Sequence, residues 1–217
     1  MTDCVLESWQ FTTTDSCSAI VIPDGCRDLI MSASSDGALA WKITDLDTQS
    51  RTVHLDSDVC LMGVRLKPGT QIAEPQLLRS ISRSMAADEQ DAQAVKSWLN
   101  DFCHLSRAIA ESLECLRSRP KTVTQAAKWL GVTPRTLQRL LISQTGRTPS
   151  FWLQLARARQ AARSLQGPMP LADIAAIHGY ADQAHMSRDI KRWFGLSPRS
   201  LTRDTEQFDR LTDSGYG

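Results

Sequence analysis

The sequence predicts an α+β fold of two domains, a small antiparallel β domain followed by an all-α domain. Residues 9–73 contain short runs rich in β-branched and aromatic side chains, separated by Asp, Gly, Ser and Pro. After Pro75 the apolar residues recur at helical spacing. The charge also changes, because residues 1–116 hold nine Lys or Arg against 17 Asp or Glu, whereas residues 117–204 hold 15 against four. We therefore predict a β-rich domain at 1–116, a basic helical domain at 117–204 and a polar tail at 205–217.

Six runs in the N-terminal part predict the strands of a small antiparallel sandwich or barrel. They are 9–14, 18–23, 28–34, 38–45, 51–56 and 60–68. The segment Pro23-Asp24-Gly25 predicts a turn, since proline fixes φ, aspartate bonds the local backbone and glycine supplies a positive φ.

Helical patterns follow the β region. Residues 77–81 predict a short helix and residues 86–93 form a polar break. Residues 95–116 then carry apolar side chains spaced by seven, which fits one helix or two helices broken near residues 104–106. The apolar members are Val95, Leu99, Phe102, Ile109, Leu113 and Leu116, with polar Ser106 among them. Such a stripe needs cover, and the simplest cover is the chain's own sheet.

The C-terminal part contains a helix-turn-helix pattern at residues 171–203. It predicts a short helix at 171–177, a turn at Gly179 and a second helix that ends at Gly195. The apolar positions that would seal the two helices against each other are Ile174, Ala175, Met186, Ile190 and Phe194. The second helix keeps an outward face of Gln, His, Ser and Arg, and a basic outward helix suits the major groove of DNA.

The chain contains the same pattern a second time, upstream. Thr133 is a good N-cap with Pro134 at the first helical position, and the helix should run to about Gln144 and end at Gly146. Thr122 or Thr124 would cap the helix before it, and Trp129 should pack in the core beside Ala126, Ala127 and Leu130. The two copies match at an offset of 48 for the first glycine and 49 afterwards. The matched pairs are Gly131 and Gly179, Leu137 and Met186, Arg139 and Arg188, Leu141 and Ile190, Gly146 and Gly195, and Pro149 and Pro198.

A linker helix at residues 151–165 joins the two copies. Its buried stripe should be Phe151, Leu155, Ala158, Ala162 and Leu165, with Arg157, Arg159 and Arg163 pointing elsewhere.

The segments GVTPRTLQRLL, TGRTP, RARQAARSL and LADIAAIHGYADQAHMSRDIKRWFGLSP together resemble the DNA-binding domain of the AraC/XylS family of bacterial transcription regulators. The resemblance covers residues 121–203. It implies a sequence-specific regulator whose two recognition helices enter adjacent major-groove segments of double-stranded promoter DNA, with RNA polymerase as a further partner if the protein is an activator. It also implies a homodimer. The stripe at 95–116 would then form the dimer interface, which is the alternative to its packing on the chain's own sheet.

Arginine can bond guanine, and glutamine adenine, with two hydrogen bonds each. The family's base-reading positions fall here on Arg135, Gln138, Arg139, Gln183, Ala184, His185, Ser187 and Arg188. For Arg139 and Arg188 the alternative is to brace the helix through Asp173 or Asp189. Candidates for phosphate contacts, which add affinity without sequence information, are Lys121, Lys128, Arg147, Thr148, Lys191, Arg192, Ser197 and Arg199.

Two short N-terminal segments, IPDGCRDLI and GVRLKPG, resemble the reduced cupin-like sensor domain of some AraC family regulators. The resemblance implies a small-molecule effector, and the residues assigned to its pocket are Trp9, Cys26, Asp28, Trp41 and Arg65. The structural alternative is that the aromatics are core residues and that Arg65 pairs with Asp28.

Other residue patterns limit the chemistry. We expect no cofactor and no metal, because metal-bearing cupins place two histidines one residue apart and only His54 lies in the β region. The six cysteines contain no C-x-x-C pair, so we expect reduced thiols, and a thiol-based sensor of oxidants or electrophiles stays open as the alternative input. A DNA-alkylation-response protein would need a Pro-Cys-His segment and a cysteine-rich zinc centre; both are absent, and we expect no enzyme.

No run of 18 apolar residues and no signal-peptide pattern at MTDCVLESWQ occurs, so we expect a cytoplasmic protein at the nucleoid, without membrane contact. The polar tail should be disordered beyond about Asp209.

Overall fold

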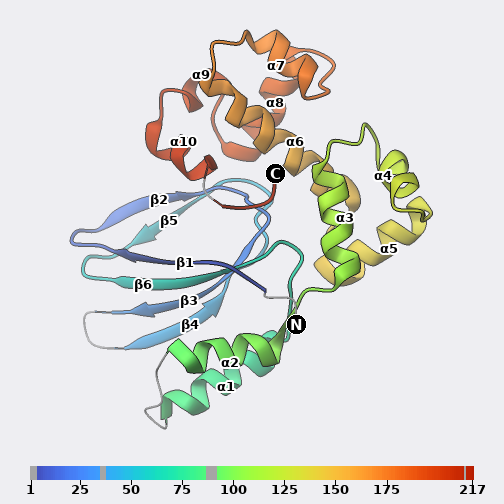
Figure 1. Ribbon diagram of the computed structural model, residues 1–217. Helices are drawn as coiled ribbons and strands as arrows, with labels where there is room; N and C mark the ends of the chain where they lie inside the picture. Colours follow the sequence, from blue (N-terminus) through green and yellow to red (C-terminus); the bar gives the residue numbers. More distant parts are fainter. Residues whose placement is uncertain (1–3, 35–37, 87–91, 213) are drawn as a thin grey trace.

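The computed structural model describes residues 4–34, 38–86, 92–212 and 214–217 (Figure 1). The strands are β1 (Val5–Thr12), β2 (Cys17–Val21), β3 (Arg27–Ala33), β4 (Leu39–Ile43), β5 (Arg51–Leu55), β6 (Cys60–Leu66), β7 (Gln71–Ile72) and β8 (Cys103–His104). The helices are α1 (Glu74–Ala86), α2 (Ala92–Phe102), α3 (Arg107–Arg117), α4 (Val123–Trp129), α5 (Pro134–Thr145), α6 (Pro149–Arg163), α7 (Leu171–Ile177), α8 (Gln183–Phe194), α9 (Pro198–Leu201) and α10 (Thr205–Thr212), with a 3-10 turn η1 (Ser164–Gln166) after α6. An N-terminal antiparallel sheet is therefore followed by a helical part, which confirms the predicted α+β class.

The β part consists of a four-stranded antiparallel sheet in the order β1-β6-β3-β4 and a separate β2–β5 pair. All six predicted strands are present. The turn at Pro23-Asp24-Gly25 is also present, because Gly25 has φ 74° and the Asp24 carboxylate accepts the Cys26 N–H at 2.8 Å. The pair β7–β8 was not predicted, since two residues carry no alternation.

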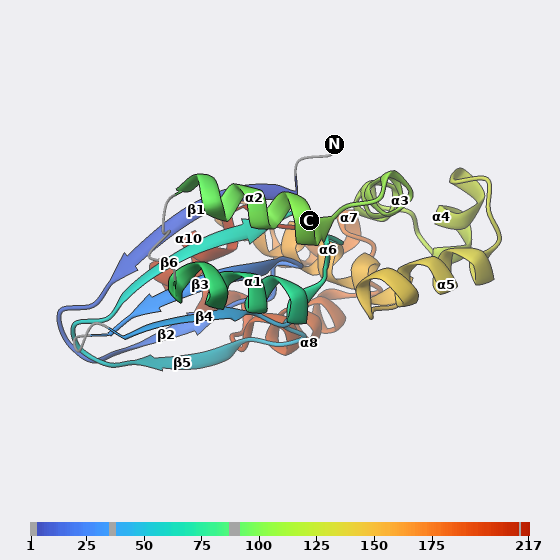
Figure 2. The same ribbon diagram turned by 90° about the horizontal axis from the view of Figure 1, so that it is seen from below.

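Helices α1 and α2 lie along one face of the four-stranded sheet (Figure 2). Leu77 and Ile81 of α1 and Trp98 and Leu99 of α2 are buried there. The predicted polar break at 86–93 falls mostly outside the described residues.

The apolar stripe at 95–116 is divided between α2 and α3. Ser106 caps α3, accepting a hydrogen bond from the Ile109 N–H, which confirms the two-helix alternative. Ile109, Leu113 and Leu116 are buried, and α3 packs against α4, α5 and α6. The chain thus covers its own stripe, the α2 half against the sheet, as predicted, and the α3 half against helices of the C-terminal part.

The helix ends of the C-terminal part follow local sequence signals. The hydroxyls of Thr122 and Thr133 cap α4 and α5, and Pro134 occupies the first turn of α5. Gly146 and Gly195 end α5 and α8 in the left-handed conformation, with φ 67° and 77°. These ends confirm the predicted helix bounds in both copies of the repeat.

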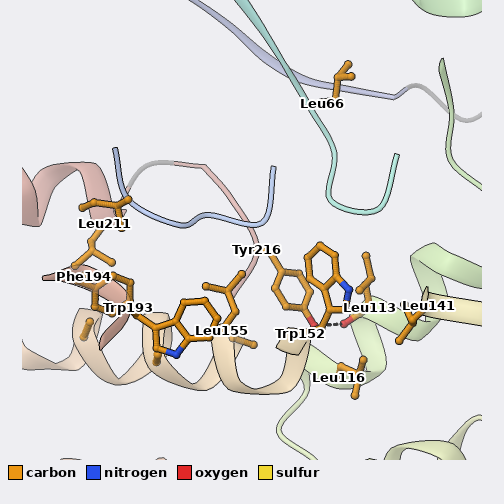
Figure 3. Packing of buried hydrophobic residues seen from close by; sticks show 14 of the residues in the cluster. Leu66, Leu113, Leu116, Leu141, Trp152, Leu155, Trp193, Phe194, Leu211 and Tyr216 are labelled. Carbon is orange, nitrogen blue, oxygen red and sulfur yellow. Dashed lines mark hydrogen bonds between the residues drawn. The ribbon is translucent and has the colours of Figure 1, made fainter. Parts of the chain in front are cut away.

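The tail prediction was wrong, because residues 205–212 form α10 and Tyr216 is buried. The Tyr216 ring meets the Trp152 ring edge-on at 5.0 Å, and its hydroxyl donates to the Leu113 carbonyl at 2.9 Å (Figure 3). Its N–H donates to the Asp24 carbonyl at 2.7 Å. The tail is polar overall, yet Phe208, Leu211 and Tyr216 are buried, and Tyr216 inserts between the β part and the helical part.

Two further residues depart from the prediction. Trp129 is 54% exposed, at the C-terminal end of α4. Arg159 is fully buried and donates to the carbonyls of Pro23 and Leu211 at 3.2 and 3.1 Å. Burial lowers the Arg159 pKa to about 10.

Candidate nucleic-acid interface

Helix α5 presents one apolar and one polar face. Leu137 and Leu141 are fully buried, whereas Arg135, Gln138 and Arg139 are exposed. No ion pair involving Arg139 occurs among the described residues, so the bracing alternative for it has no support. All three predicted base-reading side chains of the first copy lie on one accessible helix face.

Helix α8 repeats this arrangement. Met186 and Ile190 are fully buried, at the positions equivalent to Leu137 and Leu141. The predicted base-reading residues occupy the remaining face, where Gln183, Ala184 and Arg188 are exposed and His185 and Ser187 are half-buried. The His185 ring meets the Tyr180 ring edge-on at 5.2 Å, which fixes the imidazole at the rim of this face.

A buried carboxylate holds α8 against the linker helix α6. Asp189 pairs with Arg192 at 3.0 Å and with Arg157 at 3.6 Å, and it accepts a hydrogen bond from the Tyr180 hydroxyl at 3.1 Å. The Arg157 guanidinium also lies over the Tyr180 ring, at 4.4 Å. The alternative that Arg188 braces α8 through Asp189 was wrong, because Arg157 and Arg192 occupy that carboxylate.

The predicted phosphate-contacting residues fall into two groups. Side chains that project into solvent are Lys121, Lys128, Lys191 and Arg199. Side chains already engaged within the chain are Arg147, Thr148, Arg192 and Ser197. Thr148 and Ser197 cap α6 and α9, so their hydroxyls accept backbone N–H groups. Exposure therefore favours the first group for DNA contact.

The predicted effector pocket divides between two places. A cavity of about 1000 Å³ lies between the four-stranded sheet and α2, and Trp9 and Trp41 line it. Cys26, Asp28 and Arg65 are not among its described lining residues, although the Trp9 indole N–H donates to the Asp28 carboxylate at 3.1 Å. Further lining residues that the sequence did not single out include Met31, Met62, Lys96, Trp98 and Asn100. Lys96 is the only charged residue among the described residues that line the cavity.

Arg65 instead forms a cluster of ion pairs beside the C-terminal segment. Its guanidinium lies 3.0 Å from Glu7, 3.5 Å from Asp24 and 3.2 Å from Asp28. It also donates to the Ser214 carbonyl at 3.3 Å. Burial raises the Asp24 pKa, although the adjacent Arg65 charge opposes this. The structural alternative for Arg65 and Asp28 is confirmed.

All six cysteines are free thiols. Burial raises the pKa of Cys26, of Cys115 and, to about 12, of Cys103. A raised pKa lowers the fraction of reactive thiolate. Cys17 is the exposed cysteine of the chain, in strand β2. Among the helices as described, none is long and apolar enough to cross a membrane.

Residues 126–204 match the helix-turn-helix domain family. The HTH-type transcriptional regulator GlxA of Rhizobium meliloti is 36% identical over 97 residues, which are 44% of this chain and 30% of that protein. VirS of Mycobacterium tuberculosis, also an HTH-type transcriptional regulator, is 40% identical over 74 residues, which are 34% of this chain and 22% of that protein. The C-terminal domain of AraT, a response regulator from Geobacillus stearothermophilus, aligns with a TM-score of 0.43 at 26% identity over 46% of this chain and 87% of that structure. The chain spans less than a third of either curated relative.

Proposed function

We propose that this chain, whose residues 126–204 form a helix-turn-helix domain of the AraC type, is a sequence-specific DNA-binding regulator of transcription. One observation carries the proposal: α5 and α8 bury equivalent apolar residues, and each exposes a polar face that includes an arginine at the equivalent positions 139 and 188. The surrounding residues 117–204 carry the basic charge that DNA binding requires. The relatives' shared description as HTH-type transcriptional regulators supports the same function.

In this proposal α4–α5 and α7–α8 are two helix-turn-helix units that read adjacent major-groove segments. The residues proposed to read bases are Arg135, Gln138, Arg139, Gln183, Ala184, His185, Ser187 and Arg188. Ala184 offers only a methyl group, so it can contact a base but cannot form a side-chain hydrogen bond with it. Lys121, Lys128, Lys191 and Arg199 are the proposed phosphate contacts, since their charges project into solvent.

The test is selection from a random DNA library with the purified full chain. We expect enrichment of one sequence, and affinity for it that falls by about a thousandfold between roughly 50 and 200 mM salt if six to eight phosphates are neutralised. Equal retention of all sequences at every salt concentration would contradict sequence-specific regulation.

The β part, for which we retain the reduced cupin-like assignment, is proposed to modulate this activity through a small-molecule effector. The cavity under α2 supports the idea, because it is lined mainly by apolar and aromatic residues and has one cation, Lys96. We infer a small apolar effector with an anionic group. Anilinonaphthalene sulfonate should bind more tightly than uncharged anilinonaphthalene, and Lys96→Met should remove that preference. Equal binding of both probes to the parent protein would contradict an anion site.

The remaining assignments follow from regulation at a promoter. A protein of this kind acts on DNA in the cytoplasm at the nucleoid, is not an enzyme, and contacts RNA polymerase if it activates. A homodimer would need a surface other than the stripe at 95–116, since α3 buries its own share of that stripe within the chain.

The raised pKa values of the buried thiols speak against a thiol-based sensor. Replacing exposed Cys17 by serine should leave regulation unchanged, and altered regulation would reinstate that alternative.

A further inference from the structure

The connection between β4 and β5, residues 44–50, reaches the C-terminal ends of both α5 and α8. The Arg147 guanidinium, just after α5, donates to the Leu46 carbonyl at 2.9 Å. The Ser50 N–H donates to the Trp193 carbonyl in the last turn of α8 at 3.0 Å. One short loop of the β part is therefore hydrogen-bonded to α8 and to the residue that follows the C-cap of α5.

This β4–β5 loop is itself held in place. At its start, Thr44 and Asp28 exchange two hydrogen bonds, of 2.9 and 2.7 Å. At its end, Arg51 pairs with Asp47 at 2.8 Å. The loop also lies close against α8, since a Cβ added at Gly195 would be 2.7 Å from the Ser50 hydroxyl. These contacts fix the position of the loop relative to the sheet and to α8.

Comparison of the two copies shows that the helix-turn-helix pattern does not require an arginine at position 147. The position equivalent to Arg147 in the second copy is Leu196, at the offset of 49. A guanidinium is therefore not required by the motif at this place. Arg147 is half-buried and lies over the Phe151 ring at 5.4 Å, and Phe151 in turn contacts the Trp193 ring at 5.5 Å. Its side chain is directed to the loop and to the linker helix.

We infer that the β4–β5 loop sets the separation and relative orientation of α5 and α8, and that Arg147 is a positioning residue for DNA recognition and not a phosphate contact. The inference rests on the proposed function. If the separation of α5 and α8 is fixed, the protein binds tightly only to DNA whose two recognised segments have the matching spacing. Each base pair added between the segments rotates one relative to the other by about a tenth of a helical turn. The loop thereby determines specificity for spacing without touching DNA.

The test uses the full chain on the DNA sequence that the parent protein selects, and on derivatives with one base pair added or removed between the two segments. The parent should lose about tenfold in affinity on each change. Arg147→Leu, which copies the residue of the second repeat, should lose less than about threefold on each change. A Gly-Gly insertion between exposed Thr48 and Gln49 should do the same, and the two changes together should not add.

Arg199→Leu is the matched control, because it removes one exposed arginine that does not contact the loop. It should weaken binding equally at every spacing and reduce the salt slope by about one, whereas Arg147→Leu should leave the salt slope unchanged. A parent-like spacing optimum in the loop-insertion variant overturns the inference, and this variant decides if Arg147→Leu does not fold. A parent protein that selects no sequence overturns the proposed function instead.

Discussion

At the scale of single residues, the arginines of the helical part are either exposed without an ion pair in the described structure or engaged within the chain. Arg135 projects from α5 and forms no ion pair among the described residues, whereas Arg192 pairs with Asp189 and lies over the Trp193 ring at 4.9 Å. A guanidinium free to form two hydrogen bonds can discriminate one guanine, and one committed to a carboxylate stabilises the protein instead.

Replacing Arg135 by alanine should therefore weaken binding to the selected sequence by about 1–3 kcal/mol and relax the preference at one base pair. Lys191→Ala on α8 is the comparison, since a lost phosphate contact weakens binding to all sequences alike. Affinity measured on the selected site and on its single-base variants separates the two effects. An unchanged base preference in Arg135→Ala would contradict its base-reading role.

His178 should make the helical part less stable in acid. Burial, with a smaller effect of Arg119, lowers its pKa from 6.5 to about 4. Between these values the unfolded chain binds more protons than the folded one, so stability should fall as the pH drops from about 6.5 to 4. His178→Gln should reduce the loss of thermal midpoint between pH 7 and pH 5. The same loss in both proteins would show that this histidine is not responsible.

At the scale of elements, α8 depends on its buried carboxylate. Asp189→Asn should lower the free energy of unfolding by about 1.5–3 kcal/mol, because Arg157 and Arg192 lose their charged acceptor. Asp182→Asn on the same helix is the control: it also removes one negative charge, but asparagine caps a helix as well as aspartate does. Chemical denaturation of both variants tests this, and equal losses would contradict the anchoring role.

The ends of the helices could be predicted from the sequence, but their contacts with the β part could not. Helix ends set by Thr133 and Gly146 depend on neighbouring residues, so local signals located them correctly. The hydrogen bonds of Arg159 to Pro23 and of Arg147 to Leu46 join residues more than 100 positions apart. Local patterns contain no information about such partners, so the burial of Arg159 and the bond from Arg147 to the β part were not predicted. The five residues assigned to one effector pocket lie in two places, because alternation along a strand does not show which face of the sheet a helix covers.

At the scale of the whole molecule, Tyr216 joins the β part to the linker helix. Tyr216→Ala should lower the free energy of unfolding by about 3–5 kcal/mol, because it removes a buried ring packed on Trp152. Tyr216→Phe keeps the ring and loses only the hydrogen bond to Leu113, so it should cost about 1 kcal/mol. Thermal melts of both variants test this. Full parent stability in Tyr216→Ala would show that the segment does not hold the two parts together.

The measurement that tests the central claim most directly is a hydroxyl-radical footprint of the full chain on its selected DNA. Two recognition helices held on one linker helix predict two protected segments on the same face of the duplex, about one helical turn apart. Arg135→Ala should weaken protection of one segment and His185→Ala that of the other. A single protected segment, or uniform protection along the whole fragment, would contradict joint reading of DNA by α5 and α8.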